Sequence, residues 1–190
     1  MFTKNTVAVI MMVMFMAIFR DVLASPLVIP KDAILLDAPI VDQVFTLKGA
    51  LKDEIYVEFI STTYKTTKKQ AKKILANINE LTAGYDFPKK EDVLSVIAIE
   101  SSFNCKAEST SSIGCMQINR KAWRMERDYL LNVDNNIYEG IRILREYYLI
   151  MEGDKRKTLL AYNVGPTAFK KGEFNEKYWI KFQEAYKKFW

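Results

Sequence analysis

Residues 88–100 read PKKEDVLSVIAIE, and this stretch decides the fold. Proline is tolerated in a first helical turn, and the acidic pair at positions 91 and 92 lies where the helix dipole favours negative charge. Val93, Val96, Ile97 and Glu100 follow at the i, i+3, i+4 and i+7 positions of one helical face. The stretch therefore predicts a helix whose buried face is apolar except for one carboxylate at its end.

The carboxylate of Glu100 is the first candidate for chemistry. Apolar neighbours penalise the ionised form of a carboxyl group, which raises its pKa and keeps a proton available near neutral pH. A group of this kind can act as a general acid. The alternative is that Glu100 lies near the helix end and simply turns out to water.

The composition of the 190-residue chain excludes several other kinds of site. It contains no histidine and two cysteines, so a Ser-His-Asp triad, a Cys-His pair, a histidine metal site and a four-cysteine zinc site are ruled out. We therefore expect no metal and no cofactor. An apolar share of 49% is enough to close the core of one compact domain.

Three motifs follow one another along the chain. They are Glu100-Ser101, then GCMQIN at residues 114–119, then AYNVGP at residues 161–166. In this order and at similar separations they resemble the E-S, G-L-M-Q and A-Y-N motifs of the soluble lytic transglycosylases. The catalytic domain of that family is lysozyme-like and cleaves the glycan strands of peptidoglycan.

The resemblance implies a role for each motif residue. Glu100 would be the sole catalytic acid and base, and Tyr162 would donate a hydrogen bond to its carboxyl group. Ser101 would help to set the site, and Ser109 would reach an acetamido group of the substrate. The other candidates for substrate binding are Met116 and Gln117, which would line the glycan cleft, and Asn163, which would contact sugar.

Three of these residues also have a structural alternative. Tyr162 fits a core aromatic with a satisfied hydroxyl, Met116 fits plain core packing, and Gln117 fits a turn cap. Three motifs in the same order favour the functional roles over these alternatives.

The two cysteines depart from the family pattern. Cys115 stands where the second motif has leucine, and Cys105 stands where proline is common. In an exported protein, two cysteines ten residues apart around one loop indicate a disulfide. The alternative is that Cys115 is a small core residue and Cys105 an exposed thiol.

A single carboxylate in the motifs is unusual, because most glycosidases use two. The resemblance implies that the N-acetyl group of the substrate supports the reaction and that the product is a 1,6-anhydromuramoyl end. Two alternatives stay open: a muramidase on the same fold, and an exported wall-binding or assembly protein without turnover. The expected partner is peptidoglycan, and an envelope-spanning secretion or conjugation apparatus is a further candidate.

The N-terminus has the layout of a secretory signal peptide at residues 1–24. Lys4 precedes an unbroken apolar run of 13 residues, Val7 to Phe19, and the small Ala24 ends the segment. Because a bilayer span needs about 20 residues, we prefer cleavage after Ala24 to an uncleaved anchor. Export predicts a periplasmic or extracellular location. Cleavage leaves a formal charge of +4 from 26 basic and 22 acidic side chains, and export disfavours a nucleic-acid partner.

The rest of the chain divides into an arm and a domain. Residues 25–64 contain three prolines and no sustained periodicity, so we expect an irregular N-terminal arm with a short strand near Ile55–Ile60. Residues 65–190 carry the resemblance, which runs from about Ala71 to at least Tyr178. The fold expected there is all-α, a lysozyme-like group of helices with a substrate cleft. Its aromatic end, up to Trp190, predicts a helix that packs in the core.

Overall fold

The computed structural model describes residues 38–190, with side chains from residue 46 onward. The predicted signal peptide and the first part of the predicted arm lie outside the described residues. The chain divides after Ile55 into two compact units, and the second unit, Tyr56–Trp190, carries all three motifs. None of the described helices is both long enough and apolar enough to cross a membrane.

Helix α2 spans Ala38–Thr63, so the predicted irregular arm and its short strand are wrong over this range. Proline is tolerated at the start of a helix, and no proline follows Pro39 within α2. Tyr56, Val57 and Ile60 lie at helical spacing and are at most 5% exposed in the second unit. Their β-branched and aromatic character favours a strand only weakly, and burial on one helical face outweighs it.

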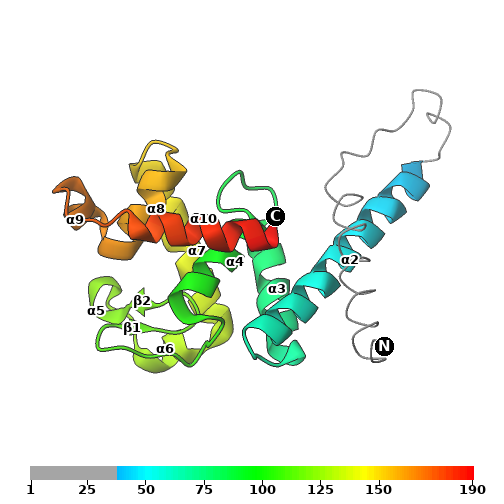
Figure 1. The fold of residues 1–190 in the computed structure, drawn as a ribbon, viewed down its shortest axis with the longest axis horizontal. Helices are drawn as coiled ribbons and strands as arrows, with labels where there is room; N and C mark the ends of the chain where they lie inside the picture. The colour runs from blue at the N-terminus through cyan, green and yellow to red at the C-terminus, as the bar shows by residue number, and fades with distance from the viewer. Residues whose placement is uncertain (1–37) are drawn as a thin grey trace, which may run out of the picture. The chain divides into compact units, whose positions relative to one another are not determined.

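The second unit is built from helices and one small hairpin (Figure 1). The all-α prediction is confirmed, because each of the two described strands is only two residues long and they pair with each other in an antiparallel hairpin. The remaining elements are α3 (Lys68–Thr82), α4 (Lys90–Ser101), β1 (Ser112–Ile113), β2 (Ile118–Asn119), α5 (Arg120–Trp123), α6 (Arg127–Leu131), α7 (Val133–Ile150), α8 (Lys155–Val164), α9 (Pro166–Lys170) and α10 (Lys177–Phe189).

Helix α4 is the element on which the site depends. Helix α10 packs against it, and α3 also contacts it. Val93, Leu94, Val96 and Ile97 of α4 have no exposed surface. Full burial of such a side chain contributes roughly 1.5–3 kcal/mol relative to exposure, so this face anchors the helix firmly.

Both ends of α4 are fixed by specific contacts. At the start, the Lys89 backbone N–H donates to Asp92 Oδ2 at 3.0 Å. The other carboxylate oxygen of buried Asp92 forms an ion pair with Lys155 of α8. At the end, Ser102 adopts a left-handed conformation with φ 51°, and the helix stops. These contacts hold Glu100, in the last turn, at a defined position.

Candidate active site

Glu100 lies partly buried in the last turn of α4. Burial raises the pKa of its carboxyl group to about 7, and the hydrogen bond from Tyr178 and the charge of Lys181 lower it by less. This is the direction expected for a carboxylate that completes an apolar face. A carboxyl group with this pKa is close to equally protonated and ionised at neutral pH, so it can both give and take a proton.

The hydrogen-bond donor to Glu100 differs from the one that the family resemblance implies. Tyr178 of α10 donates to Glu100 Oε1 at 2.6 Å. Tyr162 of α8, which we expected in this role, instead donates to the backbone carbonyl of Met116 at 2.8 Å. The prediction for Tyr162 is therefore corrected. Its hydroxyl needs one acceptor when buried, and the Met116 carbonyl supplies it.

Both tyrosines remain neutral donors. Burial, followed by the charge of Glu100, raises the pKa of Tyr178 and of Tyr162 well above the ordinary value. The Glu100 carboxyl group contacts the Tyr178 hydroxyl directly, and its charge also raises the pKa of Tyr162. The aromatic pattern of α10 predicted only core packing for Tyr178, and no motif distinguishes it from the other rings of that helix.

Ser101 connects the end of α4 to the second motif. Its hydroxyl donates to the carbonyl of Cys115 at 2.7 Å. The predicted disulfide is present and joins Cys105 to Cys115, and both residues are buried. Two links, one covalent and one polar, therefore hold the second motif beside Glu100.

Buried Asn136 of α7 positions the same motif from the other side. Its Oδ1 accepts the Met116 backbone N–H at 2.9 Å, and its Nδ2 donates to the carbonyls of Ile113 and Leu130 at 2.9 and 3.0 Å. Gly114 leaves room for this amide, because a Cβ there would lie 2.1 Å from Asn136 Nδ2. Asparagine and glycine are thus needed together for this backbone path.

Met116 does not line the cleft with its side chain, which corrects that prediction. The side chain has no exposed surface and packs against Gly140, where a Cβ would lie 2.2 Å from the Met116 sulfur. Its contribution near the cleft is the backbone carbonyl that binds Tyr162.

Gln117 does lie in the cleft wall, with φ 48°. Its Nε2 donates to the carbonyls of Ala107 and Gly114 at 3.1 and 2.9 Å. These two bonds hold the amide in one orientation, so Gln117 both braces the loop and faces the cleft.

The cleft has a volume of about 260 Å³ and a mixed polar and aromatic wall. Asn163, for which the family resemblance implies contact with sugar, lies in this wall beside Tyr162. Trp123 and Tyr147, which the motifs do not reveal, lie there too, with ring centroids 6.0 Å apart. The complete wall consists of Ser111, Ser112, Gln117, Ile118, Asn119, Ala122, Trp123, Ile143, Tyr147, Tyr162, Asn163, Val164 and Gly165.

Ser109 is not part of this wall, contrary to its predicted contact with substrate. It is exposed, and its hydroxyl accepts the Ser112 backbone N–H at 3.0 Å in the turn before β1. Ser111 and Ser112 face the cleft in its place. The turn from Ser109 to Ser112 decides which serine points inward, and the loop sequence alone does not show it.

Within residues 38–190, no group of three or more acidic or cysteine side chains could hold a metal ion.

Comparison with known families agrees with this arrangement. A family model, the transglycosylase SLT domain, matches residues 76–185. The chain belongs to the SLT transglycosylase family. No curated protein and no solved structure matches it.

The SLT match confirms the resemblance predicted from the motifs. It begins within α3 and ends within α10, so it contains Glu100, the second and third motifs, and Tyr178. The SLT domain is lysozyme-like and acts on peptidoglycan, which is the substrate that the family implies.

Proposed function

We propose that this SLT protein is a lytic transglycosylase that cleaves the β-1,4 bond between N-acetylmuramic acid and N-acetylglucosamine and leaves a 1,6-anhydromuramoyl end. One observation carries the proposal: a carboxyl group with a pKa of about 7, Glu100, accepts a hydrogen bond from a neutral tyrosine. It lies near Tyr162, which is itself part of the cleft wall.

The first step uses the protonated form of Glu100. The proton moves to the glycosidic oxygen as the bond from that oxygen to C1 of the muramic residue breaks. The N-acetyl oxygen of the same sugar supports the positive charge that develops at C1. Burial favours this step, because it keeps a fraction of Glu100 protonated at neutral pH.

The second step uses the ionised form. The Glu100 carboxylate removes the proton of the C6 hydroxyl, and O6 forms a bond to C1. The glycosidic bond is replaced by the 1,6-anhydro bond, the carboxyl group regains its proton, and no water is consumed. The hydrogen bond from Tyr178 stabilises the carboxylate between the two steps.

The surroundings of Glu100 support a mechanism with one carboxylate. The groups that shift its pKa are Tyr178 and Lys181, and no acidic side chain is among them. A retaining glycosidase that uses two carboxylates holds them about 5–5.5 Å apart, where each strongly affects the pKa of the other. This arrangement supports a reaction in which the substrate's own N-acetyl group supplies the support at C1.

The test is digestion of purified peptidoglycan by the wild type and by Glu100→Gln, with the products identified by mass spectrometry. We expect anhydromuramoyl products from the wild type and a loss of rate of about 100- to 10,000-fold in the variant, the range of acid–base assistance. Glu184→Gln, an exposed change on α10, is the matched control and keeps the wild-type rate.

Other products would decide against this reaction. Reducing muramic ends identify a muramidase, and binding of peptidoglycan without any released product identifies a wall-binding protein. Normal turnover by Glu100→Gln means that the acid is a different residue.

We also propose that the protein is exported. The signal-peptide layout of residues 1–24 supports a periplasmic or extracellular enzyme, where peptidoglycan is accessible. N-terminal sequencing of the protein purified from its native cells tests this. The expected mature N-terminus is Ser25, and a chain that keeps Met1 contradicts cleavage.

A further inference from the structure

A second cavity, of about 340 Å³, lies in the second unit outside the cleft. It is formed by the turn before α3, the loop after α4 and the start of α7. Its wall contains two lysines and several neutral polar side chains, and no acidic residue. The polar and charged residues of the wall are Lys65, Thr66, Thr67, Gln70, Ser102, Asn104 and Lys106.

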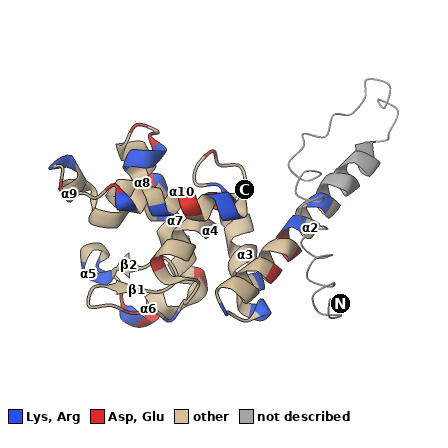
Figure 2. Cartoon of the chain, in the orientation of Figure 1, with Lys and Arg blue, Asp and Glu red and all other residues tan. Residues whose placement is uncertain are grey.

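The two lysines come from different segments and are both exposed. Lys65 lies in the turn between α2 and α3, where Figure 2 shows a concentration of basic residues, and Lys106 lies in the loop after α4. In the part of the chain that the structure describes, neither ammonium group has an ion pair. Two positive charges therefore face one cavity without a carboxylate in its wall.

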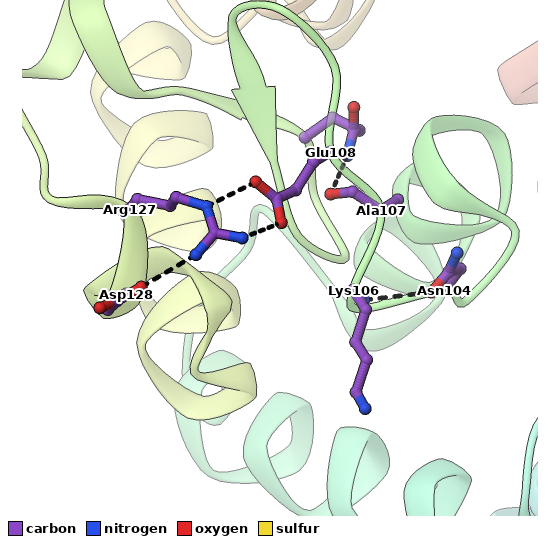
Figure 3. A network of polar contacts seen from close by, with 7 residues as sticks. Asn104, Lys106, Ala107, Glu108, Arg127 and Asp128 are labelled. Atoms are coloured by element: carbon purple, nitrogen blue, oxygen red, sulfur yellow. Dashed lines mark hydrogen bonds and ion pairs between the residues drawn. The ribbon is translucent and has the colours of Figure 1, made fainter.

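The acidic residue nearest to Lys106 in the sequence is already occupied. Glu108 binds Arg127 through two contacts, at 2.8 Å to Nε and 2.5 Å to a terminal guanidinium nitrogen. Arg127 also contacts Asp128 at 3.1 Å. Figure 3 shows the Lys106 side chain extending away from this network. Bidentate pairing with arginine is strong, so Glu108 is not available to neutralise Lys106.

Two further carboxylates, Asp134 next to the wall residue Val133 and Glu58 of α2, are also paired. Asp134 of α7 accepts from Asn77 at 2.8 Å and pairs with Lys73 at 3.0 Å. Glu58 pairs with Lys68 at 2.5 Å. The positive charge of Lys65 and Lys106 is therefore not cancelled by these neighbours.

Gln70 adds a donor that lacks an acceptor. Its Nε2 is buried and has no hydrogen-bond partner, although its backbone N–H is capped by Thr67 Oγ1 at 3.1 Å. Buried polar atoms are nearly always satisfied, and each exception needs an explanation. Gln70 is part of the cavity wall, and an oxyanion bound there would be attracted by the charges of both lysines.

We infer that this cavity binds a carboxylate of the peptide attached to the glycan strand. The inference rests on the proposed function for its source of ligand, since such peptides hang from the muramic residues of peptidoglycan. The loop that forms the wall, Ser102–Lys106, begins two residues after Glu100, and Cys105 within it is bonded to the second motif. A peptide held here lies on the same substrate that the catalytic carboxyl group cleaves.

The experiment compares the whole wild-type chain with the double variant Lys65→Gln/Lys106→Gln. The probes are a free wall tripeptide with its carboxylates intact and the same tripeptide with all carboxylates amidated, each titrated by calorimetry. We expect the acidic peptide to bind about fivefold to tenfold more weakly to the variant, the combined effect of two exposed charge contacts. The amidated peptide should not bind to either protein.

The matched control removes two lysines that lie far along the chain. Lys187→Gln/Lys188→Gln changes exposed side chains in the last turn of α10 and the net charge by the same amount. It should bind the acidic peptide like the wild type. Equal weakening in the control reduces the effect to net charge and overturns the assignment, as does unchanged binding by Lys65→Gln/Lys106→Gln.

Inorganic phosphate is the probe for a different source of negative charge. If phosphate displaces the peptide at lower concentration than free acetate does, the site prefers phosphate and the assignment to a wall peptide is wrong. Lys106→Glu serves as a second variant, because it reverses one charge in an exposed loop. It should weaken binding of the acidic peptide at least as much as Lys65→Gln/Lys106→Gln does.

The assignment of the cavity and the proposed enzymatic function can be disproved independently. Glu100→Gln should bind the peptide like the wild type, because Glu100 is not part of this wall. If the peptide binds in a way that depends on the two lysines but peptidoglycan is not cleaved, the assignment of the cavity is supported and the proposed function is wrong. Cleavage by a protein that does not bind the peptide ends the assignment of the cavity.

Discussion

The two sides of Glu100 are built in different ways. On one side, the second motif is held by Ser101 and the disulfide, which lie within or near the first two motifs, and by Asn136 of α7. On the other side, Tyr178 arrives from a helix 78 residues further along the chain, without a motif of its own. Sequence spacing predicts Ser101 and the cysteine pair on the first side, whereas Asn136 and Tyr178 are identified only by the packing of α7 and α10.

The largest effect on stability is expected on the motif side, at Asn136. Asn136→Leu keeps a similar volume but removes three buried hydrogen bonds, leaving one N–H and two carbonyls without partners. We expect the free energy of unfolding to fall by about 3–5 kcal/mol. Urea unfolding measures it. Asn135→Leu, next to it on α7, should cost under about 1 kcal/mol, and a similarly small cost at Asn136 would mean that the network does not hold the motif.

Glu100 joins the two sides, and its raised pKa couples stability to pH. The folded protein binds a proton at this site up to pH about 7, and the ordinary value is 4.5. This stabilisation is complete below pH 4.5 and disappears as the pH rises to about 7, because ionisation is disfavoured only in the folded state.

Glu100→Gln cannot ionise, so it should lose this pH dependence. We expect the variant to be more stable than the wild type by up to about 3 kcal/mol at pH 8 and nearly equal to it at pH 4. Thermal unfolding across this range measures the difference. Parallel curves for the two proteins would mean that Glu100 is solvated, and Glu184→Gln should follow the wild type throughout.

The disulfide is the next largest contribution on the motif side. Cys105→Ser/Cys115→Ser opens a loop of 10 residues' separation, and the chain-entropy model predicts a loss of about 2–3 kcal/mol of unfolding free energy. Wild-type protein unfolded under reducing conditions should show the same loss. The bond from Tyr178 to Glu100 does not involve this loop, so the pH midpoint of catalysis should stay unchanged. A shifted midpoint would mean that the two sides are not independent.

Much of the fold follows from local patterns. The helix that carries Glu100 is visible in its apolar periodicity and its acidic first turn, which are properties of neighbouring residues. Pro88, expected in the first helical turn, instead precedes the N-cap residue Lys89. The prediction of an irregular arm was wrong over α2, because the last turns of this helix are buried by residues that are distant in the sequence. Tyr56, for example, donates to Glu91 at 3.0 Å across 35 residues.

The site residues also divide into those that local sequence predicts and those that depend on tertiary packing. Gln117, which the motifs place at the cleft, lies in the cleft wall, whereas the hydroxyl of Tyr162 donates to the Met116 carbonyl and not to Glu100 as expected. The turn at Ser109 and the cavity lined by Lys65 and Lys106 have no signature in the sequence, because each depends on which loops meet in space. A motif predicts which side chain stands at a position, whereas tertiary packing determines which group that side chain contacts.

Two tyrosine variants give the smallest effect and the sharpest test of this contrast. Tyr178→Phe removes a hydrogen bond that lowers the pKa of Glu100, so the basic limb of the pH–rate profile should move to higher pH, with a loss of rate of about tenfold at pH 7. Tyr162→Phe removes a bond to a backbone carbonyl instead, so it should cost about 1 kcal/mol of unfolding free energy and leave the limb in place. If Tyr162→Phe moves the limb and Tyr178→Phe does not, the third motif supplies the donor after all, and the contact from α10 is only packing.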